Sequence, residues 1–318
     1  MNGMTRSILL LLTLAVPSSI TAQQPAAREG YVTTSDSARL FYRVAGQGRD
    51  TIIAIHGGPG VDLESIYNDF APLTTRHVVI FYDQRGAGRS TLPTDTTRLN
   101  VARQIADLDD VRQAFKLKSV TLVAHSYGPL LAASYALAHP AETTRMVFFG
   151  PVPPWRGDFQ RRYGQSLTSR LDSTQMARMG AANARLVDPT NPDIVQACRD
   201  LWAIGLRPRL AEPDRTLPLV KSDLCASDPA GIRYGLATTN RVVNGYFGDW
   251  DLRPRLKSLQ VPLLVVHGEQ ESIPMDMVEQ WATIMPHATL LRIPRAAHFT
   301  YLEQPALVWP AVETFLAP

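Results

Sequence analysis

Short apolar runs rich in β-branched residues alternate with helix-like runs along most of the chain. Each of these runs is short and bounded by polar residues, which is typical of buried strands. They cover residues 51–55, 78–82, 120–124, 145–149, 261–266 and 289–293. Regular alternation of strands and helices predicts an α/β fold with a mostly parallel sheet covered by helices on both faces.

The helix-like runs differ before and after residue 150. Residues 101–115 place Ile105, Leu108, Val111 and Phe115 on one side of a predicted helix. Residues 31–35 and 39–44 predict an N-terminal hairpin, and residues 130–138 and 305–316 predict further helices. From 151 to 255 the strand pattern stops, and proline- and arginine-rich helical segments replace it. We therefore predict a core in two parts, 23–150 and 256–318, with an inserted helical cap at 151–255.

The N-terminus has the features of a secretory signal peptide. Arg6 precedes an apolar run at 8–16, and small residues follow up to Ala22. The run is shorter than the roughly 20 residues that span a bilayer. We predict cleavage near Ala22, no stable membrane span after cleavage, and export to a periplasm or out of the cell.

The amino-acid composition indicates what kind of protein this is and which ligands it does not bind. Of 318 residues, 45% are hydrophobic and 19% charged, as expected for a soluble globular protein. The net charge of +3 is small and no dense basic run is present, which argues against nucleic-acid binding. Cys198 and Cys225 either form a disulfide in an oxidising compartment or remain buried thiols, and both possibilities stay open. Neither has a His or Cys neighbour at metal-ligand spacing, so we predict no metal site and no cofactor.

Ser126 is the candidate nucleophile. It lies where the predicted strand at 120–124 turns sharply into the helix at 130–138. Small residues flank a nucleophile at such a turn, usually as G-x-S-x-G. Here Ala124 takes the place of the first glycine and Gly128 is the second.

A reactive serine needs a base, an acid and donors for the oxyanion. His298 follows the last predicted strand and is the candidate base. The loop after the strand at 261–266 holds two candidate acids, Glu269 and Glu271. The glycine-rich run 56–60 follows a buried strand, so the backbone N–H groups of Gly58 and Tyr127 are the candidate oxyanion hole.

Together these motifs resemble a known family. The runs HGGPG at 56–60, DQRGAGRS at 83–90, the Ser126 turn and AHFTYLEQP at 297–305 are similar to α/β-hydrolases of the proline iminopeptidase type. The resemblance implies the α/β-hydrolase fold with its eight-stranded type of sheet. It also favours Glu271, because the family's acid follows the strand-ending glycine by three residues. Asp83, Arg85 and Arg89 are expected mainly to brace loops around the site.

The resemblance predicts an exported aminopeptidase that acts on a small-molecule or short-peptide substrate. Family members bind the substrate's amine with cap glutamates, but the predicted cap contains only Glu212, and Asn240 stands where one such glutamate is expected. Asp223, Asp249 and Asp251 are possible replacements. An esterase-type acyl hydrolase with the same core is the alternative, and a non-catalytic binding protein of the same fold is a third possibility.

Overall fold

The structure is a computed structural model that describes residues 27–48 and 50–317. The predicted signal peptide at 1–22 lies outside the described residues. One eight-stranded sheet has the order β1-β2-β4-β3-β5-β6-β7-β8. Its strands are β1 (Arg28–Thr33), β2 (Arg39–Ala45), β3 (Thr51–Ile55), β4 (Val78–Tyr82), β5 (Val120–His125), β6 (Thr143–Phe149), β7 (Leu263–Gly268) and β8 (Ala288–Ile293).

Six of the strands run parallel. β3 pairs with β4 and β5, and the parallel pairing continues through β6, β7 and β8. β1 and β2 form the predicted hairpin, and β2 pairs antiparallel with β4. The carboxyl ends of the six parallel strands therefore meet at one edge of the sheet, where ligands usually bind in such folds.

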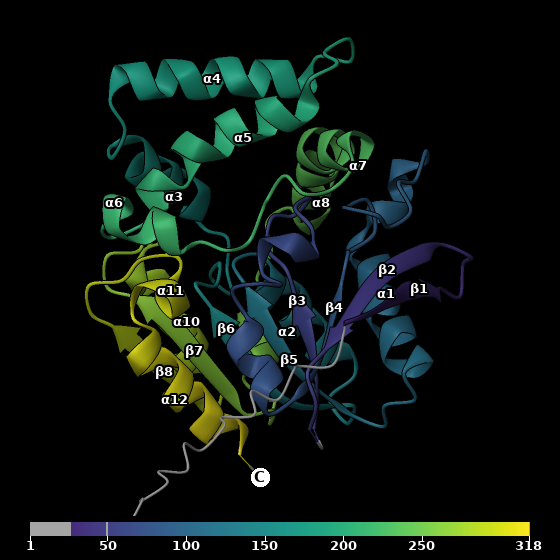
Figure 1. Cartoon of the computed structure of the whole chain (residues 1–318). Helices are drawn as coiled ribbons and strands as arrows, with labels where there is room; N and C mark the ends of the chain where they lie inside the picture. The colour runs from purple at the N-terminus through teal and green to yellow at the C-terminus, as the bar shows by residue number, and fades with distance from the viewer. Residues whose placement is uncertain (1–26, 49, 318) are drawn as a thin grey trace, which may run out of the picture.

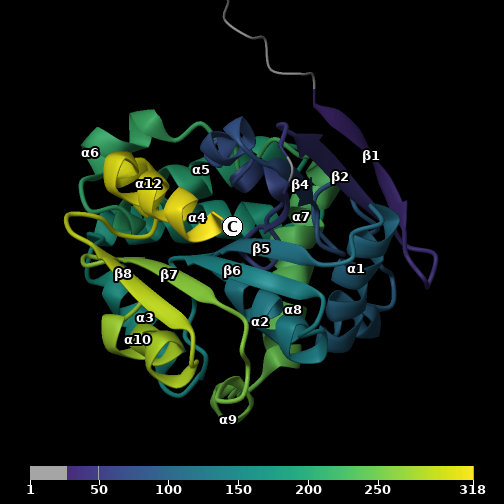
Figure 2. The same ribbon diagram turned by 90° about the horizontal axis from the view of Figure 1, so that it is seen from below.

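Alternate side chains of the central strands point to opposite faces of the sheet, and each face has its own apolar core. Ile53 belongs to the core beneath α1 (Val101–Ala114), α2 (Gly128–Ala138) and α10 (Met275–Ile284). Ile52 belongs to the core on the other face, against α12 (Pro305–Leu316). Figure 2 shows α12 on one side of the sheet and α2 and α10 on the other. Fully buried parallel strands explain the continuous apolar runs in the sequence.

A group of helices between β6 and β7 forms the cap, and Figure 1 shows α3, α4, α5, α7 and α8 stacked beyond one end of the sheet. Its helices are α3 (Phe159–Thr168), α4 (Ser173–Val187), α5 (Ile194–Gly205), α6 (Pro213–Thr216), α7 (Pro229–Arg233), α8 (Asn240–Phe247) and α9 (Arg253–Leu256). The short helix α11 (Thr300–Glu303) precedes α12. Among the described residues, no helix is long and apolar enough to cross a membrane.

Cys198 and Cys225 form a disulfide in the structure, with Cα atoms 5.9 Å apart. Cys198 lies on α5, and Cys225 lies in the segment before α7. The bridge packs with Leu186 and Ile194 in a small apolar cluster of the cap. Of the two possibilities left open by the sequence, the structure therefore has the disulfide.

Candidate active site

Ser126 occupies a strained turn between β5 and α2. Its φ is +62°, a left-handed conformation that side chains other than glycine rarely adopt. Two backbone hydrogen bonds hold it there: its N–H donates to Phe149 O at 2.9 Å, and its carbonyl accepts from Val152 N at 2.9 Å. A Cβ on Gly57 would lie 2.9 Å from Ser126 Cβ, so the neighbouring loop can approach only without a side chain. The turn thus projects Ser126 from the carboxyl edge of the sheet.

His298 and Glu271 are in direct contact. His298 Nδ1 lies 2.8 Å from Glu271 Oε2, and both side chains are buried. Since a carboxylate only accepts, the Nδ1–H donates and Nε2 carries the free lone pair. The His298 N–H donates to Arg209 O at 3.0 Å, which fixes the backbone of this loop.

Glu271 is held as a charged group. Its Oε1 accepts from Ser272 N at 2.7 Å and from Ile273 N at 3.2 Å. Burial raises its pKa, but attraction to His298 and these hydrogen bonds outweigh burial and hold the pKa at about 2. Glu269, the other candidate acid, is exposed. The geometry therefore favours Glu271 as the partner of His298.

The two candidate oxyanion donors flank Ser126. Tyr127 is the first residue after Ser126 and caps the N-terminus of α2, and Gly58 lies in the loop after β3 with φ at +110°. Within the described part of the chain, neither backbone N–H has a hydrogen-bond acceptor. Both residues line the same cavity as Ser126 and His298. Free N–H groups at a helix start attract negative charge.

His56, the first residue of the glycine-rich run, is fully buried and has a structural role. Its Nε2 accepts from Gln84 N at 3.0 Å, so the proton lies on Nδ1, which donates to Gly57 O at 2.9 Å. Burial lowers the pKa of His56 to about 4. A neutral imidazole therefore ties the loop after β3 to the loop after β4.

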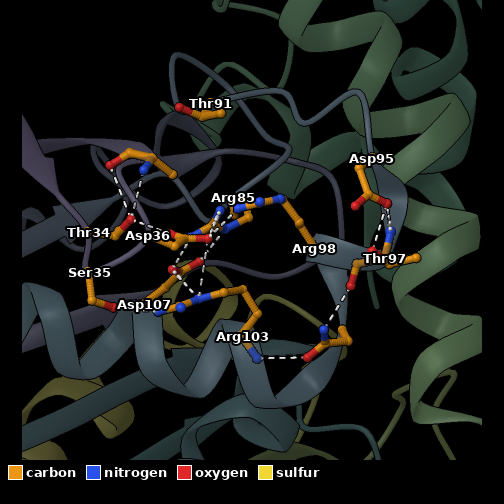
Figure 3. A network of polar contacts seen from close by, with 12 residues as sticks. Thr34, Ser35, Asp36, Arg85, Thr91, Asp95, Thr97, Arg98, Arg103 and Asp107 are labelled. Carbon is orange, nitrogen blue, oxygen red and sulfur yellow. Dashed lines mark hydrogen bonds and ion pairs between the residues drawn. The ribbon is translucent and has the colours of Figure 1, made fainter.

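The side chains of Asp83, Arg85 and Arg89, in the run at 83–90, all contact other residues of the core. Asp83 accepts from Leu63 N at 2.8 Å and from Arg89 N at 2.8 Å. Arg85 contacts Asp36 and Asp107, as Figure 3 shows. Arg89 pairs with Glu64 at 2.5 Å. These contacts agree with the expected bracing role.

A cavity of about 410 Å³ separates the sheet edge from the cap. Core residues contribute Ser126, Tyr127 and His298 to its wall. The cap contributes aromatic side chains and a few polar ones: Phe159, Gln160, Tyr163, Asn183, Trp202, Arg209, Asn240, Asn244 and Trp250. Among the described residues, no Asp or Glu lines this cavity.

None of the acidic residues considered as amine binders reaches the cavity wall. Asp249 pairs with Arg156, and Asp251 pairs with Arg253 at 2.7 Å. Asp223 lies 3.8 Å from Arg199 on the cap surface. The proposal that these carboxylates replace a family glutamate is therefore wrong for this structure.

Asn240 lies on the cavity wall, and its side chain is hydrogen-bonded to the loop after β3. Its Nδ2 donates to Pro59 O at 2.8 Å, within the run 56–60. The π-helical turn Tyr234–Thr239 precedes it, and Thr239 Oγ1 donates to Gly86 O at 2.5 Å. Asn240 thus connects the cap to the loop that carries Gly58.

Two residues that contact the loop of His298 were not predicted from the sequence. Arg209 is one of many arginines in the cap, and no motif distinguishes it. Glu303 lies inside the motif at 297–305, and its carboxylate accepts from Ala297 N and Ala211 N, both at 2.6 Å. It ties the loop of His298 to the cap segment that follows Arg209. Within the described part of the chain, no cluster of His, Cys, Asp and Glu is arranged to hold a metal ion.

Fold and site together define a class of protein. Residues 52–311 match the alpha/beta hydrolase family, and the chain belongs to this family. The sequence expectation of an α/β-hydrolase fold is confirmed, and the protein is a hydrolase.

Its particular relatives agree with the resemblance seen in the motifs. A proline iminopeptidase of Heyndrickxia coagulans is 27% identical over 292 residues, covering 91% of this chain and 98% of the relative. The crystal structure of a Mycobacterium smegmatis proline iminopeptidase has a TM-score of 0.68 at 23% identity, covering 91% and 97% of the two chains. A thermophilic esterase from Thermogutta terrifontis has a TM-score of 0.64 at 20% identity, covering 91% and 98%. At these identities the two structures share the fold with this chain.

Proposed function

We propose that the protein is a serine hydrolase in which Ser126, His298 and Glu271 act as nucleophile, base and acid. The observation that carries this proposal is the 2.8 Å contact between His298 and Glu271 beside a cavity that both His298 and Ser126 line. The left-handed turn at Ser126 supports it.

In the proposed reaction, Ser126 Oγ attacks the substrate's acyl carbon while its proton passes to His298 Nε2. The carbonyl oxygen becomes an oxyanion that accepts hydrogen bonds from the N–H groups of Gly58 and Tyr127. Glu271 stabilises the imidazolium. The intermediate collapses to an acyl-serine, and the leaving group takes the proton from His298. Water then attacks the acyl-serine with His298 as base and releases the acid.

The cavity wall favours esters without a free amine over aminopeptidase substrates. An aminopeptidase must bind a charged N-terminal amine, which requires a carboxylate or several acceptors in the pocket. Among the described wall residues the only fixed charge is the cation Arg209. A nearby cation repels an ammonium group. We therefore propose carboxylic-ester hydrolysis as the principal activity.

The second candidate is an aminopeptidase that releases N-terminal proline or another small residue. The named relatives favour it, since the protein of Heyndrickxia coagulans covers nearly the whole chain. In this case amide oxygens of the cavity wall, such as those of Asn183, Asn240 and Asn244, are available acceptors for the amine.

Parallel assays with 4-nitrophenyl butyrate and with the 4-nitroanilides of proline and alanine test the choice. We expect ester turnover that is lost in Ser126→Ala, with arylamide turnover at least about 100-fold lower in kcat/KM. Proline arylamide turnover equal to or faster than ester turnover would instead establish the aminopeptidase.

We also propose that the protein is exported. The signal-like segment at 1–22 and the Cys198–Cys225 disulfide support this, because disulfides persist in oxidising compartments. N-terminal sequencing of protein recovered outside the cytoplasm should find a mature chain beginning near residue 23. An intact N-terminus in the cytoplasmic fraction would refute export.

A further inference from the structure

Arg209 is a charged group in a cavity that offers it no counter-ion. It is the single Lys, Arg, Asp or Glu among the described residues of the cavity wall. It ends the short turn η4 (Arg207–Arg209) between α5 and α6, and it is half-buried. Its neighbour Arg207 pairs with Asp214, whereas no described carboxylate pairs with Arg209.

Neutral groups hold the Arg209 guanidinium in place. Nε donates to Tyr163 Oη at 3.2 Å, and Nη1 donates to Gly205 O. The guanidinium also lies 5.9 Å from the ring centre of Tyr163 and 5.8 Å from that of Trp202. Nη2 has no acceptor among the described residues. The side chain is therefore positioned in advance and keeps a free charged donor.

Arg209 lies beside the candidate base. Its carbonyl oxygen accepts from His298 N at 3.0 Å, so the two backbones are joined directly. Tyr163, which contacts Arg209, is also close enough to Glu271 to be affected by its charge. Burial raises the pKa of Tyr163, the Arg209 cation lowers this pKa, and the Glu271 carboxylate raises it. The cation, Ser126 and His298 thus line the same cavity.

We propose that Arg209 is a specificity-determining residue that selects ester substrates carrying a carboxylate. This inference rests on the proposed serine hydrolase function. A half-buried cation without a counter-ion is costly to desolvate, and a substrate carboxylate supplies the missing negative charge. A guanidinium also matches a carboxylate in shape and charge. The same group disfavours substrates with a free ammonium.

Pairs of isosteric esters test the proposal. In the first pair, the acyl chain of 4-nitrophenyl hemiadipate ends in a carboxylate, and that of 4-nitrophenyl 6-methylheptanoate ends in an isopropyl group of similar shape. 3-Carboxyphenyl butyrate and 3-isopropylphenyl butyrate differ in the same way on the alcohol side. A pH-stat records acid release from all four, and the ratio of kcat/KM within each pair is the readout.

We expect the wild type to prefer the acidic ester in at least one pair, and that pair identifies the side of the substrate that Arg209 binds. In Arg209→Met the ratio for that pair should fall about 10- to 100-fold, as loss of a charge-assisted hydrogen bond predicts. Arg209→Lys should retain part of the preference. An equal loss of kcat/KM for both members of a pair leaves the ratio unchanged and counts against the proposal.

Arg170→Met is the matched control. Arg170 is another cap arginine, and it donates to Gln270 O at 2.8 Å and to Pro208 O at 3.1 Å without lining the cavity. Its replacement should leave both ratios unchanged.

Two results would overturn the proposal. One is a wild type that prefers the neutral ester in both pairs. This result needs no variant, so it refutes the proposal even if Arg209→Met does not fold. The other is an Arg209→Met enzyme that keeps the wild-type ratios. No turnover of any of the four esters would instead refute the proposed ester hydrolysis, and the specificity with it.

Discussion

Gly60 and Gly235 contact each other through their backbones where the cap meets the loop that carries Gly58. A Cβ on Gly235 would lie 2.1 Å from Gly60 O, and a Cβ on Gly60 would lie 2.0 Å from Gly235 O. Gly235 lies in the π-helical turn Tyr234–Thr239, directly before α8. Neither residue can carry a side chain without moving the other.

Replacing Gly235 with alanine should therefore disturb catalysis from the cap side. The new methyl group must displace the loop at 56–60, and with it the proposed oxyanion donor Gly58. Small displacements of catalytic groups lower the reaction rate strongly, so we expect kcat for 4-nitrophenyl butyrate to fall about 10- to 100-fold.

Gly245→Ala provides the matched control. Gly245 is exposed in α8, and nothing lies within 4 Å of a Cβ built on it. Alanine is favoured over glycine within a helix, so this variant should keep wild-type kcat and gain about 0.5–1 kcal/mol of stability. Equal activity of the two variants would show that the Gly60–Gly235 contact does not control the site.

Substitution of the two loop glutamates separates the acid from its neighbour. Glu271→Gln keeps the shape of the side chain but removes the charge that orients and stabilises His298. We expect kcat/KM for esters to fall about 10³- to 10⁴-fold. Glu269→Gln changes an exposed side chain and should stay within about twofold of the wild type. A larger loss at residue 269 than at residue 271 would refute the assignment.

The sequence predicted most of the sheet and the candidate triad. The bounds of β3 and β4 coincide with the predicted runs 51–55 and 78–82, because fully buried strands are short, apolar and rich in β-branched residues. Ser126, Glu271 and His298 follow separate strands of a parallel sheet, so their meeting at one edge follows from the fold. The contact distances themselves required the structure.

The helical cap was predicted from the sequence, but the residues with which it lines the cavity were not, for physical reasons. The cavity is lined by residues of separate helical segments, among them Asn183, Trp202 and Arg209. The hydrophobic periodicity of one helix does not predict which of its faces lines a cavity together with other helices. The disulfide depended on a Cα separation of 5.9 Å that spacing along the chain cannot give. None of the three aspartates considered as substitutes lines the cavity, and each lies within 4 Å of an arginine.

Asp62 and Asp83 form a buried acidic pair that should make stability depend on pH. Burial raises the pKa of both carboxyls, and repulsion from Asp62 raises that of Asp83 further. The folded state then binds protons more tightly than the unfolded state, so this pair loses stability as the pH rises above about 4.

Asp62→Asn should relieve this loss. The amide can still accept from Glu64 N and can donate to Ser227 Oγ, the two present contacts of Asp62. The free energy of unfolding of the variant minus that of the wild type should increase from pH 5 to pH 8 in urea titrations. A difference that is constant or decreases with pH would contradict the raised pKa values.

The Cys198–Cys225 disulfide should stabilise the cap. The bridge closes a loop of 27 residues, which in the chain-entropy account is worth about 3 kcal/mol. A Cys198→Ala/Cys225→Ala variant should lose about this much free energy of unfolding. Adding a reductant should destabilise the wild type and leave the double variant unchanged. Equal sensitivity of the two proteins to reductant would show that the bridge contributes nothing.

The central claim is that Ser126 is a nucleophile activated by His298. The most direct measurement is labelling of the folded protein with a fluorophosphonate, followed by peptide mass spectrometry and residual ester hydrolysis. We predict one phosphonylated residue, Ser126, with loss of activity in proportion to labelling, and no labelling of Ser126→Ala. Labelling at another residue, or wild-type ester turnover by Ser126→Ala, would contradict the account.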